Sequence, residues 1–258
     1  GGAPMSGLIL SRRGLVASAA AGLGGLLTGC DQASRSPRVL SILQAAERLS
    51  YRTQRLLQSG QPLAREFSHS DLSPIFKVNG TEHPGGDAYK ALLDTQFADW
   101  RLAVNGLVQR PLSLSLAQLR AMPGRTQITR HDCVEGWSAI GQWTGVPLSQ
   151  LLRLSGLAAN ARFIVFHCAD ELAAGSLYYE SIDLVDAFHP QTILAYDLNR
   201  APLEVGHGAP LRLRVERQLG YKHAKYVMSI EAVDRLDNIQ GGKGGFWEDR
   251  GYEWYAGI

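Results

Sequence analysis

Residues 129–148 read TRHDCVEGWSAIGQWTGVPL and contain Cys133, one of three cysteines in the chain. Apolar and polar side chains alternate from Ile128 to Val134, which predicts a strand that leads up to this cysteine. Four residues that interrupt regular structure follow it, namely Gly136, Gly141, Gly145 and Pro147. We therefore expect Cys133 to lie where a strand gives way to a loop, and loops on a rigid scaffold carry many functional side chains.

The neighbours of Cys133 indicate chemistry for its thiol. Arg130 and His131 carry or can carry positive charge, which lowers the pKa of a nearby thiol, although adjacent strand residues point to opposite faces. A thiolate of this kind is a candidate metal ligand or nucleophile. From these residues alone, a small buried structural cysteine is the competing interpretation.

Residues 133–148, CVEGWSAIGQWTGVPL, resemble the molybdenum-ligating segment of the sulfite oxidase family of molybdopterin enzymes. The resemblance is to the bacterial periplasmic branch that includes protein-methionine-sulfoxide reductase catalytic subunits, and it extends from about Phe67 to the C-terminus. It implies a mixed-sheet α+β fold of the sulfite oxidase type and a molybdenum-molybdopterin cofactor. It also implies that Cys133 is the protein ligand to molybdenum and the catalytic residue.

A second segment, FKVNGTEHP at residues 76–84, resembles the part of these proteins that lies along the pterin. Asn79 is the best matched position, and Glu82 and His83 follow at about the expected offset. The resemblance implies that all three contact the cofactor. Without it, Asn79-Gly80 is a turn dipeptide.

Two further segments resemble cofactor-binding elements of the family. GAPLR at residues 208–212 resembles a G-A-P-x-R element whose arginine, here Arg212, binds the cofactor. His223, Ala224 and Lys225 stand where relatives often have Gly-Ile-Lys, with backbone and lysine contacts. His223 departs from that pattern and is a possible extra donor.

His207 and Cys168 complete the cofactor-binding candidates, at positions where relatives carry asparagine and threonine, respectively. Two alternatives stay open here. Cys168 ends an apolar run and is equally well interpreted as a buried structural cysteine. The i, i+2 spacing of Arg212 and Arg214, with Arg217 beyond, is also typical of one exposed strand face.

The N-terminal residues resemble an export signal. Arg12 and Arg13 form a twin-arginine signature, and the apolar run up to Gly29 is too short to span a bilayer core of about 30 Å. Leu27-Thr28-Gly29-Cys30 resembles a lipobox. The resemblance implies a twin-arginine lipoprotein signal over residues 1–29, lipidation of Cys30, and a protein anchored at the periplasmic side of the inner membrane. A buried N-terminal helix is the alternative.

The rest of the chain divides into two parts. Residues 30–66 are expected to form a lipidated tether and a helix over residues 38–58, where apolar side chains recur at helical spacing. Residues 67–258 are expected to form the molybdopterin-binding oxidoreductase domain. There the patterns predict strands over residues 100–108, 162–168, 192–196, 211–215 and 226–230, and short helices over residues 116–121, 149–154 and 182–188.

Composition excludes a nucleic-acid-binding protein. The formal charge is +2, and removal of residues 1–29 leaves 24 basic and 24 acidic residues. No basic stripe with interleaved aromatic residues is present. The aromatic residues instead gather near the C-terminus, in GGFWEDRGYEWYAGI at residues 244–258, which predicts a packed flap or a docking face.

The resemblance implies an oxidoreductase that transfers an oxygen atom, of the sulfoxide reductase or sulfite oxidase type, to or from a small or protein-bound substrate. The sequence has no Cys-x-x-Cys-His haem site and no GxGxxG fingerprint, so we expect a membrane cytochrome or quinone-linked redox partner. We expect a monomer. The alternatives are a non-catalytic molybdopterin-binding lipoprotein and a cysteine hydrolase that uses Cys133 with His131.

Overall fold

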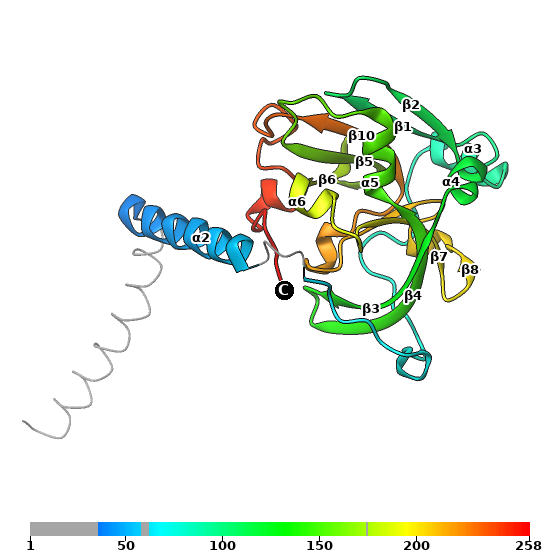
Figure 1. Ribbon diagram of the computed structural model, residues 1–258, viewed down its shortest axis with the longest axis horizontal. Helices are drawn as coiled ribbons and strands as arrows, with labels where there is room; N and C mark the ends of the chain where they lie inside the picture. Colours follow the sequence, from blue (N-terminus) through cyan, green and yellow to red (C-terminus); the bar gives the residue numbers. More distant parts are fainter. Residues whose placement is uncertain (1–35, 58–61, 174) are drawn as a thin grey trace, which may run out of the picture. The chain divides into compact units, whose positions relative to one another are not determined.

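The computed structural model describes residues 36–57, 62–173 and 175–258 (Figure 1). The chain divides into two compact units, residues 1–60 and 61–258. In the first unit the described structure is helix α2 (Pro37–Leu57), which confirms the helix predicted there. The expected signal and Cys30 lie outside the described residues. Within the part of the chain that the structure describes, no helix combines the length and apolarity needed to cross a membrane.

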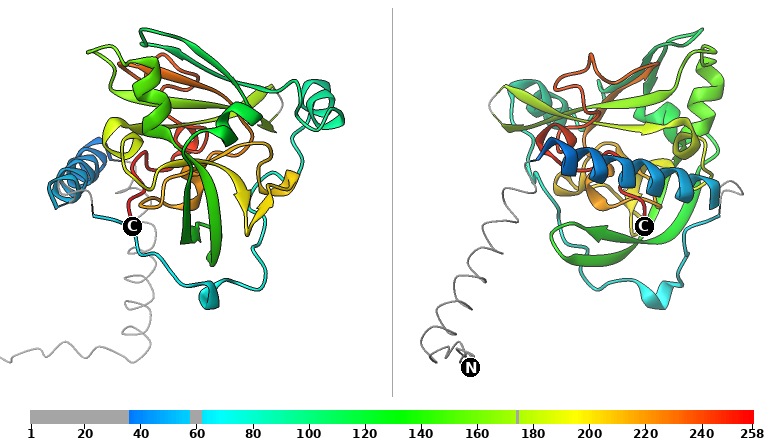
Figure 2. Two further views of the ribbon diagram at one scale, coloured as in Figure 1. Left: turned by 45° about the vertical axis from the view of Figure 1, so that its right-hand side comes forward. Right: turned by 90° about the vertical axis from the view of Figure 1, so that its left-hand side faces the viewer.

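The second unit contains two five-stranded sheets (Figures 1 and 2). The first has the order β2 (Leu112–Ser115), β1 (Arg101–Gly106), β10 (Val227–Val233), β5 (Phe163–Ala173), β6 (Ser176–Asp183), and only β1 and β10 are parallel. The second has the order β3 (Arg125–Cys133), β4 (Trp137–Pro147), β7 (Ile193–Leu198), β8 (Ala201–Pro202), and β9 (Arg212–Arg214) pairs with β7. The short helices are α3 (Asp87–Asp94), α4 (Leu116–Ala121), α5 (Leu148–Ser155) and α6 (Leu184–Ala187). The predicted α+β fold is confirmed.

The β3–β4 hairpin corrects the expectation of a loop after Cys133. β3 does end at Cys133, but a short turn that includes Gly136 (φ 85°) leads directly into the eleven-residue strand β4. The glycines inside β4 serve close packing instead of turns. A Cβ on Gly141 would lie 2.9 Å from the Leu198 side chain, and one on Gly145 would lie 2.2 Å from the Leu194 carbonyl oxygen.

Strand β6 was not predicted from the sequence, and the helix expected over residues 182–188 begins only at Leu184. Tyr178, Tyr179, Glu180 and Ser181 are all buried, so β6 lacks the alternation of a half-exposed strand. Asp183 ends the strand and caps α6, because its carboxylate accepts a hydrogen bond from the Asp186 N–H at 3.0 Å.

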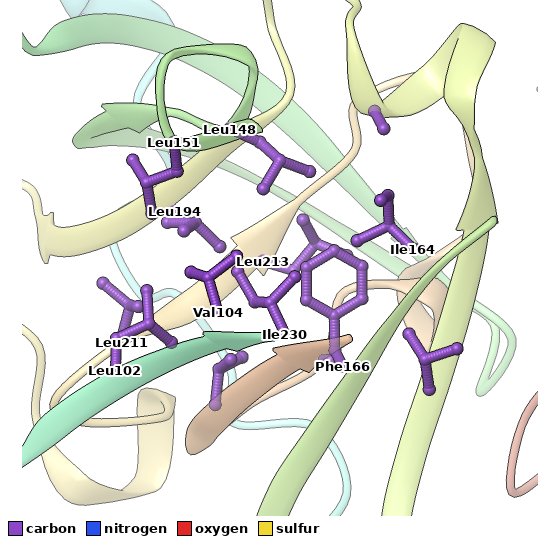
Figure 3. Packing of buried hydrophobic residues seen from close by; sticks show 14 of the residues in the cluster. Leu102, Val104, Leu148, Leu151, Ile164, Phe166, Leu194, Leu211, Leu213 and Ile230 are labelled. Carbon is purple, nitrogen blue, oxygen red and sulfur yellow. The ribbon is translucent and has the colours of Figure 1, made fainter. Parts of the chain in front are cut away.

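The main hydrophobic core lies between the two sheets (Figure 3). The first sheet contributes Val104, Phe166 and Ile230, and the second contributes Leu194 and Leu213; all five are fully buried. Leu148 and Leu151 of α5 close the core on one side. These contacts fix β9, which pairs with the second sheet, against the first sheet. The segments just before and after β9 are therefore held on a rigid platform.

Candidate active site

Cys133 lines a cavity of about 240 Å³. It is the last residue of β3, it is half-buried, and its carbonyl oxygen accepts a hydrogen bond from the Gly136 N–H at 3.0 Å. The walls come from segments far apart in the sequence: Asn79, Gly80 and Thr81; Val134 and Glu135; Asp170, Leu172 and Tyr178; Gly220, Tyr221, His223 and Lys225; and Trp247 and Tyr252. The fold therefore brings the cysteine together with two of the three predicted cofactor-binding segments, those around residues 79 and 225.

The environment of Cys133 raises the pKa of its thiol. Burial is the main cause and the Glu135 carboxylate adds to it, while the Glu135 N–H and Lys77 act in the opposite direction. The expectation that Arg130 and His131 lower this pKa is therefore wrong. The Arg130 guanidinium pairs with Asp132 at 2.9 Å, and His131 binds Arg214. A thiolate at this position needs a positive partner that a metal ion supplies.

The arginines in and after β9 are buried, which corrects the interpretation of an exposed face. Arg214 pairs with Glu216 at 2.6 Å, and Arg217 pairs with Asp186 at 2.6 Å. Arg212 differs from both.

Arg212 is 0% exposed and makes no ion pair with any described residue. Its guanidinium donates to the carbonyl oxygens of His207 at 3.0 Å and His223 at 3.5 Å and lies over the Trp143 ring, and its Nε has no partner. Burial, with repulsion from Arg214, lowers the pKa of Arg212 to about 9. A buried cation without a counter-charge is costly, and a bound anion would remove that cost.

Lys225 ties the loop around Asn79 to the site. Its ammonium donates to the carbonyl oxygens of Asn79 at 2.6 Å, Gly206 at 2.9 Å and Thr81. Burial, together with repulsion from Arg212, lowers the pKa of Lys225 to about 7. The structure thus places Asn79 and Lys225 in direct contact at one end of the cavity.

Two neutral histidines lie side by side, His223 in the wall of the cavity and His131 next to it, with ring centroids 5.1 Å apart. His223 donates from Nε2 to the Gln218 carbonyl oxygen at 3.0 Å, and its Nδ1 has no partner. Arg214 donates to Nδ1 of His131 at 2.9 Å. Burial is the main cause that lowers both pKa values well below the ordinary histidine range. Because the Nδ1 lone pair of His131 already binds a cation, the structure offers little support for His131 as the base of a cysteine hydrolase.

Other predicted site residues do not line the Cys133 cavity. Glu82 and His83 are exposed, and His83 lines a separate surface pocket. His207 donates from Nε2 to the Phe76 carbonyl oxygen at 3.0 Å and lines another pocket. Cys168 is buried in the core, and both Cys133 and Cys168 are free thiols.

Ala224 holds its segment in place through its backbone, because its carbonyl oxygen accepts from the Leu213 N–H at 2.8 Å. Among the cavity residues that sequence reasoning missed are three with ionisable side chains, Asp170, Tyr178 and Tyr221. The available signal for Asp170 was its place two residues after Cys168, which sets both on one face of a regular strand.

The residues around Cys133 fit an anionic cofactor that carries hydrogen-bonding groups. Arg212 and Lys225 are buried cations that bind only backbone carbonyls among the described residues. Several buried polar atoms here also lack partners, among them Arg212 Nε, His131 Nε2 and His223 Nδ1. Native proteins rarely leave such atoms unsatisfied, so their concentration here indicates a bound group.

Residues 89–239 match the family described as the oxidoreductase molybdopterin binding domain. The chain belongs to this family. It is 38% identical over 237 residues to a putative protein-methionine-sulfoxide reductase subunit, YedZ1, of Azospira oryzae. The matched region covers 91% of this chain and 84% of that relative. It is 30% identical over 221 residues to the protein-methionine-sulfoxide reductase catalytic subunit MsrP of Xanthomonas campestris, covering 81% of this chain and 66% of that relative.

Among solved structures, the sulfane dehydrogenase SoxCD from Paracoccus pantotrophus is similar to this chain, with 25% sequence identity and a TM-score of 0.49. The similar region covers 53% of this chain and 39% of the SoxCD chain. The family match and the relatives together identify the protein as a molybdopterin-dependent oxidoreductase of the sulfite oxidase type. The predicted family and enzyme class are confirmed.

Arg212 and Arg214 provide a matched test of which buried arginine serves the cofactor. We expect Arg212→Met to lower retention of molybdopterin roughly 10- to 100-fold, because a charge-assisted hydrogen bond contributes about 1.5–3 kcal/mol. The cofactor-free protein should keep its stability, since Arg212 has no carboxylate partner to orphan. Arg214→Met should instead lower the free energy of unfolding by about 3–5 kcal/mol, because it leaves Glu216 buried and unpaired.

The measurements are pterin content after gel filtration and chemical unfolding of the cofactor-free variants. Equal loss of stability in both variants, with unchanged cofactor retention in Arg212→Met, would contradict this assignment.

Proposed function

We propose that the protein reduces sulfoxides, including methionine sulfoxide in proteins, at a molybdenum-molybdopterin centre held by the thiolate of Cys133. Arg212, Ala224 and Asn79 hold the cofactor, Lys225 fixes the loop of Asn79 beside it and adds positive charge, and His223 adds a contact through Nδ1. When bound, the cofactor supplies the acceptor for the oxygen atom and the two electrons that the reaction needs. The protein residues bind the substrate, orient it towards Cys133 and control its proton supply.

The charge of the cavity is the observation that carries this proposal. Two carboxylates line it, Glu135 and Asp170, and Lys225 is the only lysine or arginine among the described lining residues. All three hydrogens of the Lys225 ammonium are taken by backbone carbonyls. An anionic substrate such as sulfite therefore finds no available cation there, whereas a neutral sulfoxide avoids that electrostatic cost.

The aromatic wall of the cavity supports the same substrate class. Trp247 and Tyr252 stack with ring centroids 5.3 Å apart, and Tyr221 meets Tyr252 edge-on at 5.2 Å. Sulfur next to an aromatic ring is stabilised by about 0.3–1.5 kcal/mol, which favours a thioether-like side chain. Tyr252 is 42% exposed, so this wall reaches the surface, where a side chain of another protein has access. The relatives named as protein-methionine-sulfoxide reductases agree with this choice.

Electrons would come from a separate membrane redox partner of the cytochrome or quinone-linked kind, since the sequence carries no haem motif of its own. The twin-arginine signature and the lipobox ending at Cys30 support export of the loaded protein and anchoring at the periplasmic side of the inner membrane.

The test compares substrates with the loaded enzyme. With a reduced viologen as electron donor, we expect turnover of a peptide that contains methionine sulfoxide and of dimethyl sulfoxide. With an electron acceptor and sulfite, we expect none. Oxidation of sulfite without reduction of any sulfoxide would reject the proposal, and protein from a molybdate-starved host is the blank.

A further inference from the structure

Asp170 is a buried carboxyl group in the wall of the Cys133 cavity. It is 3% exposed, and its Oδ1 makes no hydrogen bond. It lies where the pairing of β5 with β6 shifts, between His167 and Glu171, and the adjacent Ala169 N–H donates to the Tyr226 carbonyl oxygen at 3.0 Å. Such irregularities are common next to active sites.

The surroundings of Asp170 bring its pKa close enough to neutral pH for a fraction of this carboxyl group to carry a proton there. The titratable groups that face it are Tyr89 of α3, Cys168 of β5, Tyr178 of β6, and Lys225 and Tyr226 ahead of β10. Burial raises the pKa of Asp170 to about 6, and the Thr81 hydroxyl and Lys225 limit this rise. The thiol and the phenols all have pKa values raised above their ordinary range and stay neutral.

The reaction needs such a proton. Reduction of a sulfoxide breaks the S–O bond, takes two electrons from the reductant, and takes two protons that convert the departing oxygen into water. Proton donation by a positioned side chain contributes typically 10²- to 10⁴-fold to a rate, and it works best when the pKa of the donor is close to the operating pH.

The other acidic groups of the cavity are engaged elsewhere. The Tyr178 hydroxyl donates to the Tyr221 carbonyl oxygen, and the Tyr221 hydroxyl donates to the Glu253 carbonyl oxygen at 2.5 Å. Glu135 is exposed at the rim and accepts from the Trp137 indole N–H at 2.9 Å.

We propose that Asp170 is the proton donor for oxygen removal in this cavity, an assignment that rests on the proposed reduction of sulfoxides. Its O–H bond breaks as the departing oxygen gains the hydrogen, and the carboxylate that remains takes a new proton from water at the open side of the cavity. The side chain is thus a catalytic residue, distinct from those that hold the cofactor.

The test measures kcat for dimethyl sulfoxide between pH 5 and pH 9, with a reduced viologen, in the loaded wild type and in Asp170→Asn. An acid must be protonated to donate, so wild-type kcat should fall as the pH rises through the pKa of Asp170. Asp170→Asn should lose about 100-fold or more of kcat at pH 6 and lose that pH dependence, with KM little changed. Asp170→Glu, which restores an acidic proton, should recover part of kcat. Glu171→Gln, at the next and exposed position of β5, should match the wild type.

Molybdenum content and thermal unfolding are measured on every sample. Unchanged kcat and pH dependence in Asp170→Asn would overturn the proposal. Loss of molybdenum from both Asp170 variants would also overturn it, because Asp170 would then hold the cofactor. Failure of the proposed function is distinguishable, since in that case the loaded wild type itself reduces no sulfoxide.

Discussion

A Cys133→Ser variant is expected to lose nearly all of its molybdenum, falling roughly tenfold or more below a wild type that carries about one metal per chain. Serine keeps the shape of the side chain but replaces a soft sulfur donor with a hydroxyl that stays protonated at neutral pH. The measurement is metal analysis of protein purified from a molybdate-replete host that is competent for twin-arginine export.

Cys168→Ala is the matched control for this experiment. Cys168 is 3% exposed within the hydrophobic core and does not line the cavity, so its loss should leave the molybdenum content close to that of the wild type. Retention of molybdenum by Cys133→Ser would reject Cys133 as the ligand. Loss of molybdenum from Cys168→Ala at unchanged stability would restore Cys168 to the cofactor site.

Sequence reasoning located Cys133 well because the signal there is local. Alternating side chains predicted β3, and the strand does end at the cysteine. The same reasoning failed from Trp137 onward, where glycines indicated a loop but strand β4 begins. Gly141 and Gly145 do not form turns. A larger side chain at Gly141 would clash with Phe76 and Leu198, and one at Gly145 would clash with the backbone of β7, and these neighbours come from distant parts of the chain.

The buried charges were beyond sequence patterns for a related reason. Spacing places Arg212 and Arg214 on one face of a strand but gives no information on what covers that face. In the structure the face lies against the Trp143 ring, 5.0 Å from the Arg212 guanidinium and 4.4 Å from that of Arg214. Asp170 was missed because its spacing from Cys168 gives its face of β5 but not the distant segments that enclose a cavity on that face.

Another buried cation, Lys222, anchors the segment that forms the aromatic wall of the cavity. Lys222 is fully buried and donates to Glu180 of β6 and, at 2.6 Å, to Glu248. Glu248 belongs to the C-terminal segment that carries Trp247 and Tyr252. One lysine thus joins two carboxyl groups and fixes that segment to the first sheet. Burial is the main cause that raises the pKa of Glu180 well above its ordinary range; Lys222 acts in the opposite direction, and Glu248 adds a smaller increase. We therefore expect Glu180 to keep its proton at neutral pH, which would bring the cluster close to neutral.

This arrangement predicts a large difference between two substitutions. Lys222→Met should lower the free energy of unfolding of the loaded protein by about 3–5 kcal/mol, because it leaves Glu248 as a buried charge without its partner. The loosened segment should also raise KM for sulfoxides. Glu180→Gln should cost far less at neutral pH, since glutamine mimics the protonated acid in size and hydrogen bonding. Denaturant unfolding at matched molybdenum content measures both values, and equal losses in the two variants would contradict a protonated Glu180.

The pH dependence gives an independent check on the same cluster. A carboxyl group whose pKa is raised by folding contributes stability that is complete below its unfolded pKa, about 4.3, and is lost as the pH rises towards the folded pKa. The wild type should therefore lose stability relative to Glu180→Gln as the pH increases above this value. Asp249→Asn, a change of a nearby and only partly buried acid, should not remove that slope. If the wild type and Glu180→Gln instead keep a constant difference in the free energy of unfolding from pH 5 to pH 8, Glu180 is ionised in the folded protein, and Lys222 holds two carboxylates in place of one.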